Sequence, residues 1–373
     1  MMGAPNEVRV APDVMIRLVR AMFARAGCSE TEAACIAERL TGANLRGHDS
    51  HGVIRVPRYL EWAESGRQKI GQTVETVMEN DVMAILDGNY GFGQTIGEQT
   101  VDIGLKKVKQ HGLALTALRN SGHLGRIGDW AERAAEAGVA SLHMVNVRGS
   151  LLVAPFGARE RRMGTSPFCI GIPVEGQDPV VHDFATSTVA EGKALVALRG
   201  GKALPEGALI DADGALTSDP WPLYGDVPEG KAPMPYEGPG ALTAFGGHKG
   251  SGLNFMMEMM AGALTGSGCA GGPGEPERRR FCNGMLSIYI DTEKFDGQDS
   301  MAEEIKSYIA FVKSARTADG HSEVLVPGEN ERRVMAERQA AGLPLAAAAW
   351  SDILGSARNL GFTEAELNAL TAA

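Results

Sequence analysis

The chain has 373 residues, of which 44% are hydrophobic and 22% charged, and its formal net charge is −10. This length exceeds the usual size of one hydrophobic core, so we expect two domains. The acidic balance argues against nucleic-acid binding, which needs a concentrated basic surface. Because no apolar run approaches the ~20 residues of a membrane span and no secretory signal is apparent, we expect a cytoplasmic protein with no membrane partner.

The N-terminal part is predicted to be helical. Ser29 and Glu32 form a capping-box pattern, in which each side chain can satisfy an amide at the helix start. Apolar residues then follow helical spacing and lead directly into "GHDSHGVIRVPRY", residues 47–59. The five cysteines are an odd number without a CxxC pair, which argues against a disulfide framework or a structural zinc site.

The 47–59 stretch contains two histidines, an aspartate, a serine and two arginines within thirteen residues. His51 and Arg55 are four residues apart, so they would share one face of a helix that Pro57 ends or kinks. A general acid beside a guanidinium suits a substrate that carries both a carbonyl and a carboxylate. A metal site at His48, Asp49 and His51 is the alternative, but it needs further ligands and no HExxH motif occurs.

Strands and helices alternate from about residue 113. "LALTALRN" (113–120) is predicted to be a strand, "SGHLG" a loop, and the segment around Trp130 a helix that ends at Gly138. "VASLHMVNV" (139–147) is predicted to be the next strand. His123 would lie at the strand-to-helix turn, where functional groups are common in open sheets, although a lone loop histidine is more often structural.

The later part combines helices with glycine-rich turns. Residues 246–266 are predicted to form a helix. One stripe of this helix is predicted to pack in the core and contains Leu253, Met256, Met257, Met260 and Leu264. Its "GGHKGSG" start could attract an anion or could be only a flexible helix entry. A loop over 267–280 ends in a basic run at Arg278–Arg280. Two more helices are predicted, one after "VPGENE" (326–331) and one through Trp350 and Ile353.

Helical ends around a mixed middle predict a discontinuous helical domain, residues 1–80 with 300–373, and an α/β domain, residues 81–299. One literal dinucleotide fingerprint exists, "GSGCAG" at Gly266, Gly268 and Gly271. We reject it, because it follows a helix and precedes a loop, whereas the mechanism needs a strand before it and a helix after it.

Eight segments together resemble the malate/L-lactate dehydrogenase family, whose members lack a Rossmann domain. They are "GHDSHGVIRVPRY", "DGNYGFGQ", "NSGHLGRIGDWAE", "VAPFGARERRMGTSPF", "DFATSTVAEGK", "LPEGALIDADGALTSDP", "GGHKGSGL" and "VLVPGENE". The chain is most similar to the hydroxycarboxylate dehydrogenase B branch, which reduces 2-oxo acids with NAD(P)H.

The resemblance implies an α/β (α+β) fold with a largely antiparallel mixed sheet in a non-Rossmann NAD(P)-binding domain. It also implies a homodimer with the active site at the subunit interface, and NADPH or NADH as cofactor. By the family's pattern, the cofactor contacts fall on His51, Gly125, Arg126, Ile127, Val181, His182, Asp183, Phe184, Ala185, His248, Lys249, Asn283, Val326, Pro327, Gly328 and Glu329.

The implied reaction is hydride transfer between the nicotinamide and the C2 carbon of a 2-oxo or 2-hydroxy acid. His51 or His123 would carry the proton, with His51 favoured, and Arg55 would bind the substrate carboxylate. Ser50 and Thr165 would assist by hydrogen bonding.

Three positions depart from the family pattern. Ser166 replaces the usual asparagine, Asp129 a usual aromatic residue, and Glu191 a common arginine. Asp129 bears on substrate choice at the His123 loop, and Glu191 weakens an assumed preference for NADP.

Three alternatives stay open. A cyclic-imine (piperideine- or pyrroline-2-carboxylate) reductase of the same family would use the same His and Arg. A catalytically silent binding protein or a metal hydrolase would belong to another class.

Overall fold

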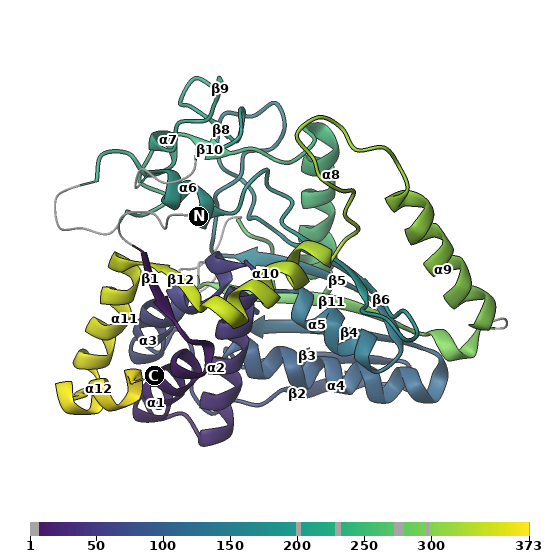
Figure 1. The fold of residues 1–373 in the computed structure, drawn as a ribbon, viewed down its shortest axis with the longest axis horizontal. Coiled ribbons are helices and arrows are strands. Elements are labelled where there is room, and N and C mark those ends of the chain that lie inside the picture. Colours follow the sequence, from purple (N-terminus) through teal and green to yellow (C-terminus); the bar gives the residue numbers. More distant parts are fainter. Residues whose placement is uncertain (1–6, 199–202, 228–232, 272–279, 296–297, 373) are drawn as a thin grey trace.

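The computed structural model describes residues 7–198, 203–227, 233–271, 280–295 and 298–372 (Figure 1). Part of the predicted 267–280 loop and of its basic run therefore lies outside the described residues. At the centre is a seven-stranded sheet whose only parallel pair is β3–β4. Its strand order is β2 (Glu75–Glu79), β3 (Met83–Asp87), β4 (Leu113–Ser121), β11 (Cys282–Asp291), β5 (Val139–Arg148), β6 (Phe168–Ile172) and β7 (Val180–Phe184). The predicted largely antiparallel mixed sheet is confirmed.

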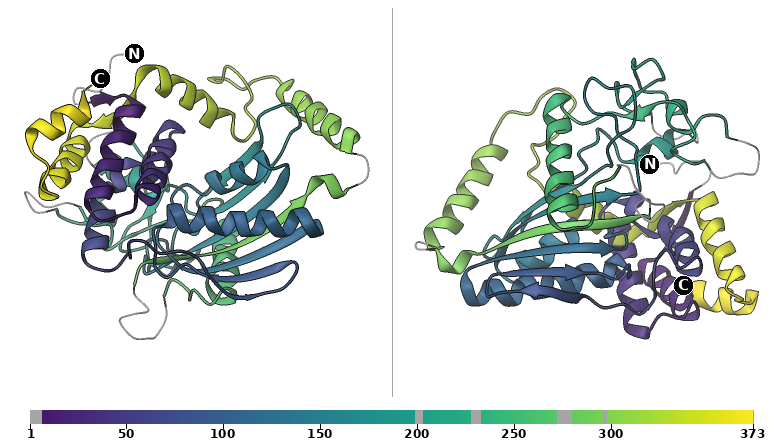
Figure 2. Two further views of the ribbon diagram at one scale, coloured as in Figure 1. Left: turned by 90° about the horizontal axis from the view of Figure 1, so that it is seen from below. Right: turned by 180° about the vertical axis from the view of Figure 1, so that it is seen from behind.

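Helices cover both faces of this sheet (Figure 2). α4 (Gly93–His111) and α5 (Gly128–Glu136) pack on one face, where Met285 and Tyr289 of β11 point into their core. α8 (His248–Met257) continues into η3 (Glu258–Leu264), a π-helical segment that packs on the other face. There Gly284 lies so close to η3 that a Cβ would meet the Ala261 carbonyl oxygen at 2.1 Å.

The close approach of α4 to the sheet gives a first prediction. A Cβ at Gly104 would meet the Tyr289 ring at 2.3 Å, and that ring is fully buried. Gly104→Ala should therefore lower the free energy of unfolding by ~1–3 kcal/mol through overpacking, measured by guanidinium unfolding. Gly355→Ala is the matched control, because nothing lies within 4 Å of its Cβ. This control should stabilise its helix by up to ~1 kcal/mol, and equal effects of the two changes would contradict the argument.

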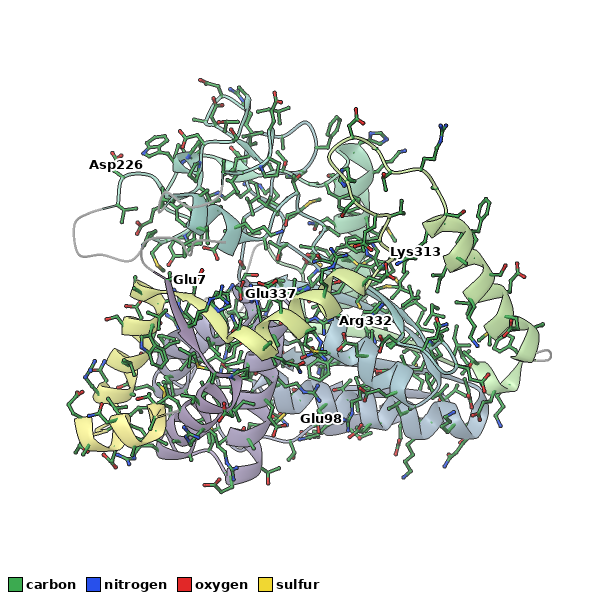
Figure 3. All side chains as sticks on the ribbon, viewed as in Figure 1. Glu7, Glu98, Asp226, Lys313, Arg332 and Glu337 are labelled. Carbon is green, nitrogen blue, oxygen red and sulfur yellow. The ribbon has the colours of Figure 1, made fainter. Side chains whose placement is uncertain are left out.

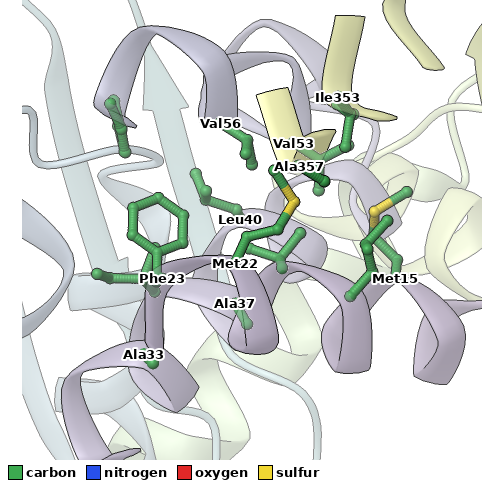
Figure 4. Packing of buried hydrophobic residues seen from close by; sticks show 14 of the residues in the cluster. Met15, Met22, Phe23, Ala33, Ala37, Leu40, Val53, Val56, Ile353 and Ala357 are labelled. Carbon is green, nitrogen blue, oxygen red and sulfur yellow. The ribbon is translucent and has the colours of Figure 1, made fainter. Parts of the chain in front are cut away.

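A helical core is built from both ends of the chain (Figure 4). Its largest buried side chains include Met15, Phe23 and Leu40, and Ile353 and Ala357 reach it from the C-terminal part. Its elements are β1 (Glu7–Val10), α1 (Pro12–Arg25), α2 (Glu30–Leu45), α3 (Val56–Glu64), β12 (Leu343–Ala346), α11 (Ala347–Asn359) and α12 (Glu364–Thr371). The exact division into domains stays a prediction.

A third, smaller core lies above the sheet in Figure 1 and contains fully buried Leu223 and Tyr224. Residues of α6 (Glu191–Leu198), β8 (Leu209–Ile210), α7 (Trp221–Tyr224) and β10 (Ala241–Leu242) contribute to it, and β9 (Leu216–Thr217) pairs with β8 outside this core. Further elements are η5 (Thr292–Lys294), α9 (Gln298–Lys313) and α10 (Glu329–Ala341). In the described part of the chain, no helix combines the length and apolar character that crossing a bilayer requires.

Two local predictions need correction. The Ser29 hydroxyl accepts from the Glu32 amide as expected, but the Glu32 carboxylate accepts from the Gly71 amide instead of returning to Ser29. The capping box is thus only half formed, because Glu32 is used to tie a distant loop to α2.

The predicted stripe on 246–266 does not form a core. Met257 is buried, but Met256 is 49% and Leu264 64% exposed. The face that meets the sheet instead carries small and polar residues such as Asn254 and Glu258. They fit there because the facing strands offer glycine and asparagine rather than large apolar side chains.

Candidate active site

A cavity of about 1660 Å³ opens between the three cores. It gathers predicted residues from segments that are distant in the sequence: the 47–59 stretch, the His123 loop, the 164–167 turn and the end of β7. The predicted site residues that line it are Ser50, His51, Arg55, His123, Gly125, Arg126, Ile127, Thr165, Asp183, Phe184 and Ala185.

His51 and Arg55 face this cavity from two short 3-10 turns rather than from one helix. The turns are η1 (Asp49–His51) and η2 (Val53–Arg55), and α3 begins at Val56. The prediction of a continuous helix ended by Pro57 is therefore wrong. Gly52 is extended and interrupts the helical hydrogen bonds, whereas Pro57 lies in the first turn of α3, where a missing amide proton costs nothing.

Two residues outside the predicted set hold η1 and η2 in place. The Asn44 side chain is buried, accepts from the Val53 amide at 2.7 Å and donates to the Asp49 carboxylate at 2.6 Å. Arg338 of α10 pairs with both oxygens of the same carboxylate, at 2.6 and 3.0 Å. The turn that carries His51 and Arg55 is thus fixed from the N-terminal helices on one side and from α10 on the other.

The two histidines lie against each other at the bottom of the cavity. Their rings are nearly parallel, with 8° between planes and 5.5 Å between centroids. His51 Nδ1 lies 3.1 Å from the Ser50 hydroxyl, and His123 Nδ1 lies 2.6 Å from the Tyr59 hydroxyl. Among the described residues neither Nε2 has a hydrogen-bond partner in the protein.

The hydrogen bonds around Tyr59 favour one tautomer of His123. Gln94 Nε2 donates to the His123 carbonyl and to the Tyr59 oxygen, so that oxygen already accepts a hydrogen bond. Burial raises the pKa of Tyr59 to about 12, so its proton stays in place and is available for His123 Nδ1. We infer from this that Tyr59 is the donor and that the neutral His123 ring carries its own proton on Nε2.

Both histidines are neutral near pH 7 in this arrangement. Burial lowers the pKa of His51 well below its usual range, and the neighbouring His123 ring and the Arg55 charge lower it further. Burial and the Arg55 charge lower the pKa of His123 to about 3. Each ring still has partial access to the cavity that it lines.

Removal of the Tyr59 hydroxyl should release the tautomer of His123. In Tyr59→Phe the ring packing is kept but His123 Nδ1 loses its donor, so both neutral tautomers should be populated. We expect a fall in kcat of about 10-fold, the usual worth of one lost hydrogen bond. Ring nitrogen NMR shifts would report the tautomer. Buried His143, held between Ser141 and Ser287, provides an internal reference whose signals should not move.

Arg55 is oriented by the turn that carries it. Its Nε donates to the Ser50 carbonyl at 2.6 Å, which leaves the two terminal nitrogens directed at the cavity. Nη2 lies 3.9 Å from Glu191, the residue at the start of α6. Glu191, which stands where the family commonly has an arginine, thus lies beside Arg55. A Cβ at the following Gly192 would meet the Ser50 side chain at 2.7 Å, so glycine permits this close contact of α6 with η1.

The 125–129 segment is fixed by buried ion pairs. Arg126 is 1% exposed and pairs with Asp129 at 2.8 Å and with Glu132 at 2.7 Å. Although burial opposes its charge, these carboxylates raise the pKa of Arg126. Asp183 accepts a hydrogen bond from the Gly128 amide at 2.7 Å, which joins the end of β7 to the start of α5. Asp129, which departs from the family pattern, thus balances the charge of Arg126 and does not line the cavity.

The "VPGENE" turn lines a second cavity of about 490 Å³. Gly328 has φ +93°, and its Cα packs against the start of β7, where a Cβ would lie 3.4 Å from the Val181 amide. Glu329 accepts from the Val326 amide and pairs with Lys313, while Arg332 donates to the Pro179 carbonyl. Figure 3 labels Lys313 and Arg332 among the side chains of the molecule. The first cavity is lined by the other end of β7 and by Asn330 and Glu331, so the two cavities follow the same two segments.

Seven predicted residues line neither cavity, namely Val181, His182, His248, Lys249, Asn283, Pro327 and Gly328. His248 and Lys249 are exposed at the start of α8, and His182 is exposed on β7. Asn283 is buried and ties β11 to the chain around it, accepting from the Leu124 amide and donating to the Asn146 carbonyl. It supports the His123 loop from behind.

The positioning residues Asn44, Tyr59, Gln94 and Arg338 were missed from the sequence. Only Tyr59 had a signal, since it lies four residues after Arg55 in the same motif. Asn44 and Gln94 act through single buried amides, and Arg338 is 289 residues away from Asp49.

No three His, Cys, Asp or Glu side chains within the described ranges are arranged to hold a metal ion.

Comparisons with known proteins agree with this geometry. Residues 10–354 match the family model described as malate/L-lactate dehydrogenase. Hydroxycarboxylate dehydrogenase B of Escherichia coli K12 is 38% identical over 94% of each chain. A solved E. coli structure assigned to the malate/lactate dehydrogenases superposes with a TM-score of 0.89 at 36% identity, covering 98% of this chain and 100% of the other.

A solved Δ1-piperideine-2-carboxylate reductase from Pseudomonas syringae pvar. tomato has a lower TM-score of 0.77, at 29% identity over 94% of this chain and 99% of the other. The family match covers most of the chain, including both histidines and Arg55. The chain therefore belongs to the malate/L-lactate dehydrogenase family.

Proposed function

We propose that the protein is an NAD(P)H-dependent oxidoreductase that interconverts 2-oxo acids and 2-hydroxycarboxylates. The family and its relatives support an oxidoreductase of 2-hydroxy acids. The observation that carries the proposal is the joint position of His51, His123 and Arg55 on one cavity. Two imidazole rings beside a guanidinium that lines the cavity match an oxygen that changes its protonation and a carboxylate next to it.

The two cavities suit a nicotinamide dinucleotide. Both cavities run along β7 and the start of α10, so one extended ligand could occupy the two together. Seven arginines and Lys193 line the described part of the first cavity against three carboxylates, in a protein whose net charge is −10. This local excess of positive charge favours anionic ligands such as a pyrophosphate and a carboxylate. The choice between NADH and NADPH stays open.

In the proposed mechanism Arg55 binds the substrate carboxylate through its two terminal nitrogens. This places the C2 oxygen near the Nε2 atoms of His51 and His123. A nicotinamide cofactor bound in this cavity would supply the hydride for reduction at C2 and accept it in oxidation. His123 donates a hydrogen bond from Nε2 and stabilises the negative charge on that oxygen. Its cavity-facing nitrogen already carries a proton, so we assign the proton transfer to His51.

His51 can carry a proton because the Ser50 hydroxyl can rotate. That hydroxyl donates to Nδ1 or accepts from it, so His51 can hold a proton on Nε2 or offer a lone pair there. A substrate carboxylate at Arg55 would offset one of the charges that lower the His51 pKa. Binding of the 2-oxo acid should therefore help His51 to become the general acid.

The cyclic-imine alternative would use the same three residues and is less well supported. The piperideine-carboxylate reductase structure has a lower TM-score than the E. coli dehydrogenase structure.

The predicted homodimer has one supporting feature. Tyr308 and Phe311 of α9 are 66% and 73% exposed on one side of a helix that lies at the end of the molecule (Figure 1). A second copy of this chain is the occupant we propose for that surface, to be checked by sedimentation of Tyr308→Glu against the unaltered protein. The cytoplasmic location stays a prediction.

The test is absorbance of NADPH and NADH with purified protein and a substrate panel. Pyruvate, 2-oxoglutarate, phenylpyruvate, hydroxyphenylpyruvate, oxaloacetate and piperideine-2-carboxylate cover both the 2-oxo acids and the imine. Oxidation of either cofactor with a 2-oxo acid, lost in His51→Ala and Arg55→Ala, is the expected result. Turnover of the imine alone would support the alternative. No turnover, together with no quenching of protein fluorescence by either cofactor, would contradict the dehydrogenase.

A further inference from the structure

Glu191 places a carboxylate beside the arginine that would bind the substrate. Its Oε2 lies 3.9 Å from Arg55 Nη2, and its Oε1 accepts from the buried Tyr224 hydroxyl at 2.9 Å. The Glu191 side chain is only 17% exposed and lines the same cavity as both histidines. It is therefore a fixed acceptor next to the reaction centre rather than a mobile surface charge.

The mechanism does not use this carboxylate. Arg55 is oriented by the Ser50 carbonyl without help from Glu191, and a 2-oxo acid needs cations and donors around its own carboxylate. A second negative charge 3.9 Å from Arg55 weakens the pull of Arg55 on any anion. A carboxylate kept there by a buried tyrosine is better explained as a contact for another part of the substrate.

We propose that Glu191 selects the substrate side chain: the enzyme favours 2-oxo acids whose side chain carries a hydrogen-bond donor or a positive charge, and disfavours those with a second anionic group. This inference rests on the proposed 2-oxo acid reduction. With the first carboxylate on Arg55, the second carboxylate of a four- or five-carbon dicarboxylic acid is only a few ångströms away and meets Glu191. Like charges in a partly dehydrated cavity repel, whereas an amide, hydroxyl or ammonium group donates to Glu191 Oε2, which accepts no hydrogen bond shorter than its 3.9 Å contact with Arg55 among the described residues.

Acid and amide pairs of equal shape test this directly. Oxaloacetate is compared with 2-oxosuccinamate, and 2-oxoglutarate with 2-oxoglutaramate, each by kcat/KM with the preferred cofactor. The amide should be favoured at least 10-fold over the acid in the unaltered enzyme. Each ratio is taken within one protein, so a general change in activity cancels.

Three variants sharpen the comparison. Glu191→Gln should bring the amide-to-acid ratio close to one, and Glu191→Arg should reverse it in favour of the acid. Glu206→Gln removes one negative charge at an exposed position outside the cavity and should leave the ratio as it is in the unaltered enzyme. This control separates a local contact from a change in overall charge.

Two results would overturn the inference while leaving the proposed function intact. One is equal or better use of the dicarboxylic acids by the unaltered enzyme. The other is a ratio that Glu191→Gln changes no more than Glu206→Gln does. If none of the four compounds and no other 2-oxo acid is reduced, the proposed function itself has failed.

Discussion

His51→Gln should lower kcat for 2-oxo acid reduction by ~10²–10⁴-fold, the usual range for the loss of a general acid. Glutamine keeps a hydrogen-bond donor of similar length but cannot carry a proton. The Arg55 site stays in place, because Asn44 and Arg338 hold the turn without using the His51 ring. The measurement is steady-state reduction and oxidation over a range of pH.

The pH dependence has a defined sign. Because burial, His123 and Arg55 lower the His51 pKa, the free enzyme holds His51 neutral above that pKa. Reduction needs the protonated ring, so its kcat/KM should fall as pH rises. Oxidation needs the neutral ring, so its kcat/KM should rise through the same low pKa and then level off. In His51→Gln both dependences should disappear.

His123→Gln is the matched control for this assignment. Its Nε2–H serves as a donor only, and a glutamine amide can replace a donor in part. We therefore expect a loss of only about 10-fold, with the pH dependence kept. A larger loss in His123→Gln than in His51→Gln would show that His123 carries the proton and that Tyr59 does not define its tautomer.

Two strands of the sheet and several helices could be predicted because they depend on local patterns, whereas the largely antiparallel sheet was implied by the family resemblance. Short apolar runs bounded by turns marked β4 and β5, and helical spacing marked α5 and α11. β1 and β12 could not be predicted, since each has four residues and they pair across more than 330 positions of the chain. The helical stripe on 246–266 failed because the facing strands carry Gly284 and Asn146, which favour small and polar partners.

The sequence could indicate candidate residues that line one cavity, but not what positions them. His51, Arg55 and His123 belong to motifs that are recognisable as short strings. Their conformation depends on distant single contacts, such as Arg338 with Asp49 and Gln94 with Tyr59. Glu191 was recognised only as a departure from a pattern, since its distance from Arg55 depends on how α6 packs against η1.

Arg55 should show the second large effect, and two substitutions separate its two roles. Arg55→Gln removes both the planar fork and the charge, and it should lower kcat/KM for a 2-oxo acid by ~10³-fold, equivalent to about 4 kcal/mol of lost charge-assisted hydrogen bonds. Arg55→Lys keeps the charge but not the fork, so its loss should be smaller, on the order of 10–100-fold.

The pH profiles then identify the charge effect, because Arg55 lowers the pKa of both His51 and His123. In Arg55→Gln this influence is gone, the His51 pKa rises, and the fall of reduction with increasing pH should begin at higher pH than in the unaltered enzyme. In Arg55→Lys a positive charge remains and the profile should stay close to the original. If Arg55→Gln and Arg55→Lys show the same pH dependence of reduction, Arg55 binds the carboxylate without influencing the protonation of the histidines. The pKa of the general acid would then be lowered by burial alone.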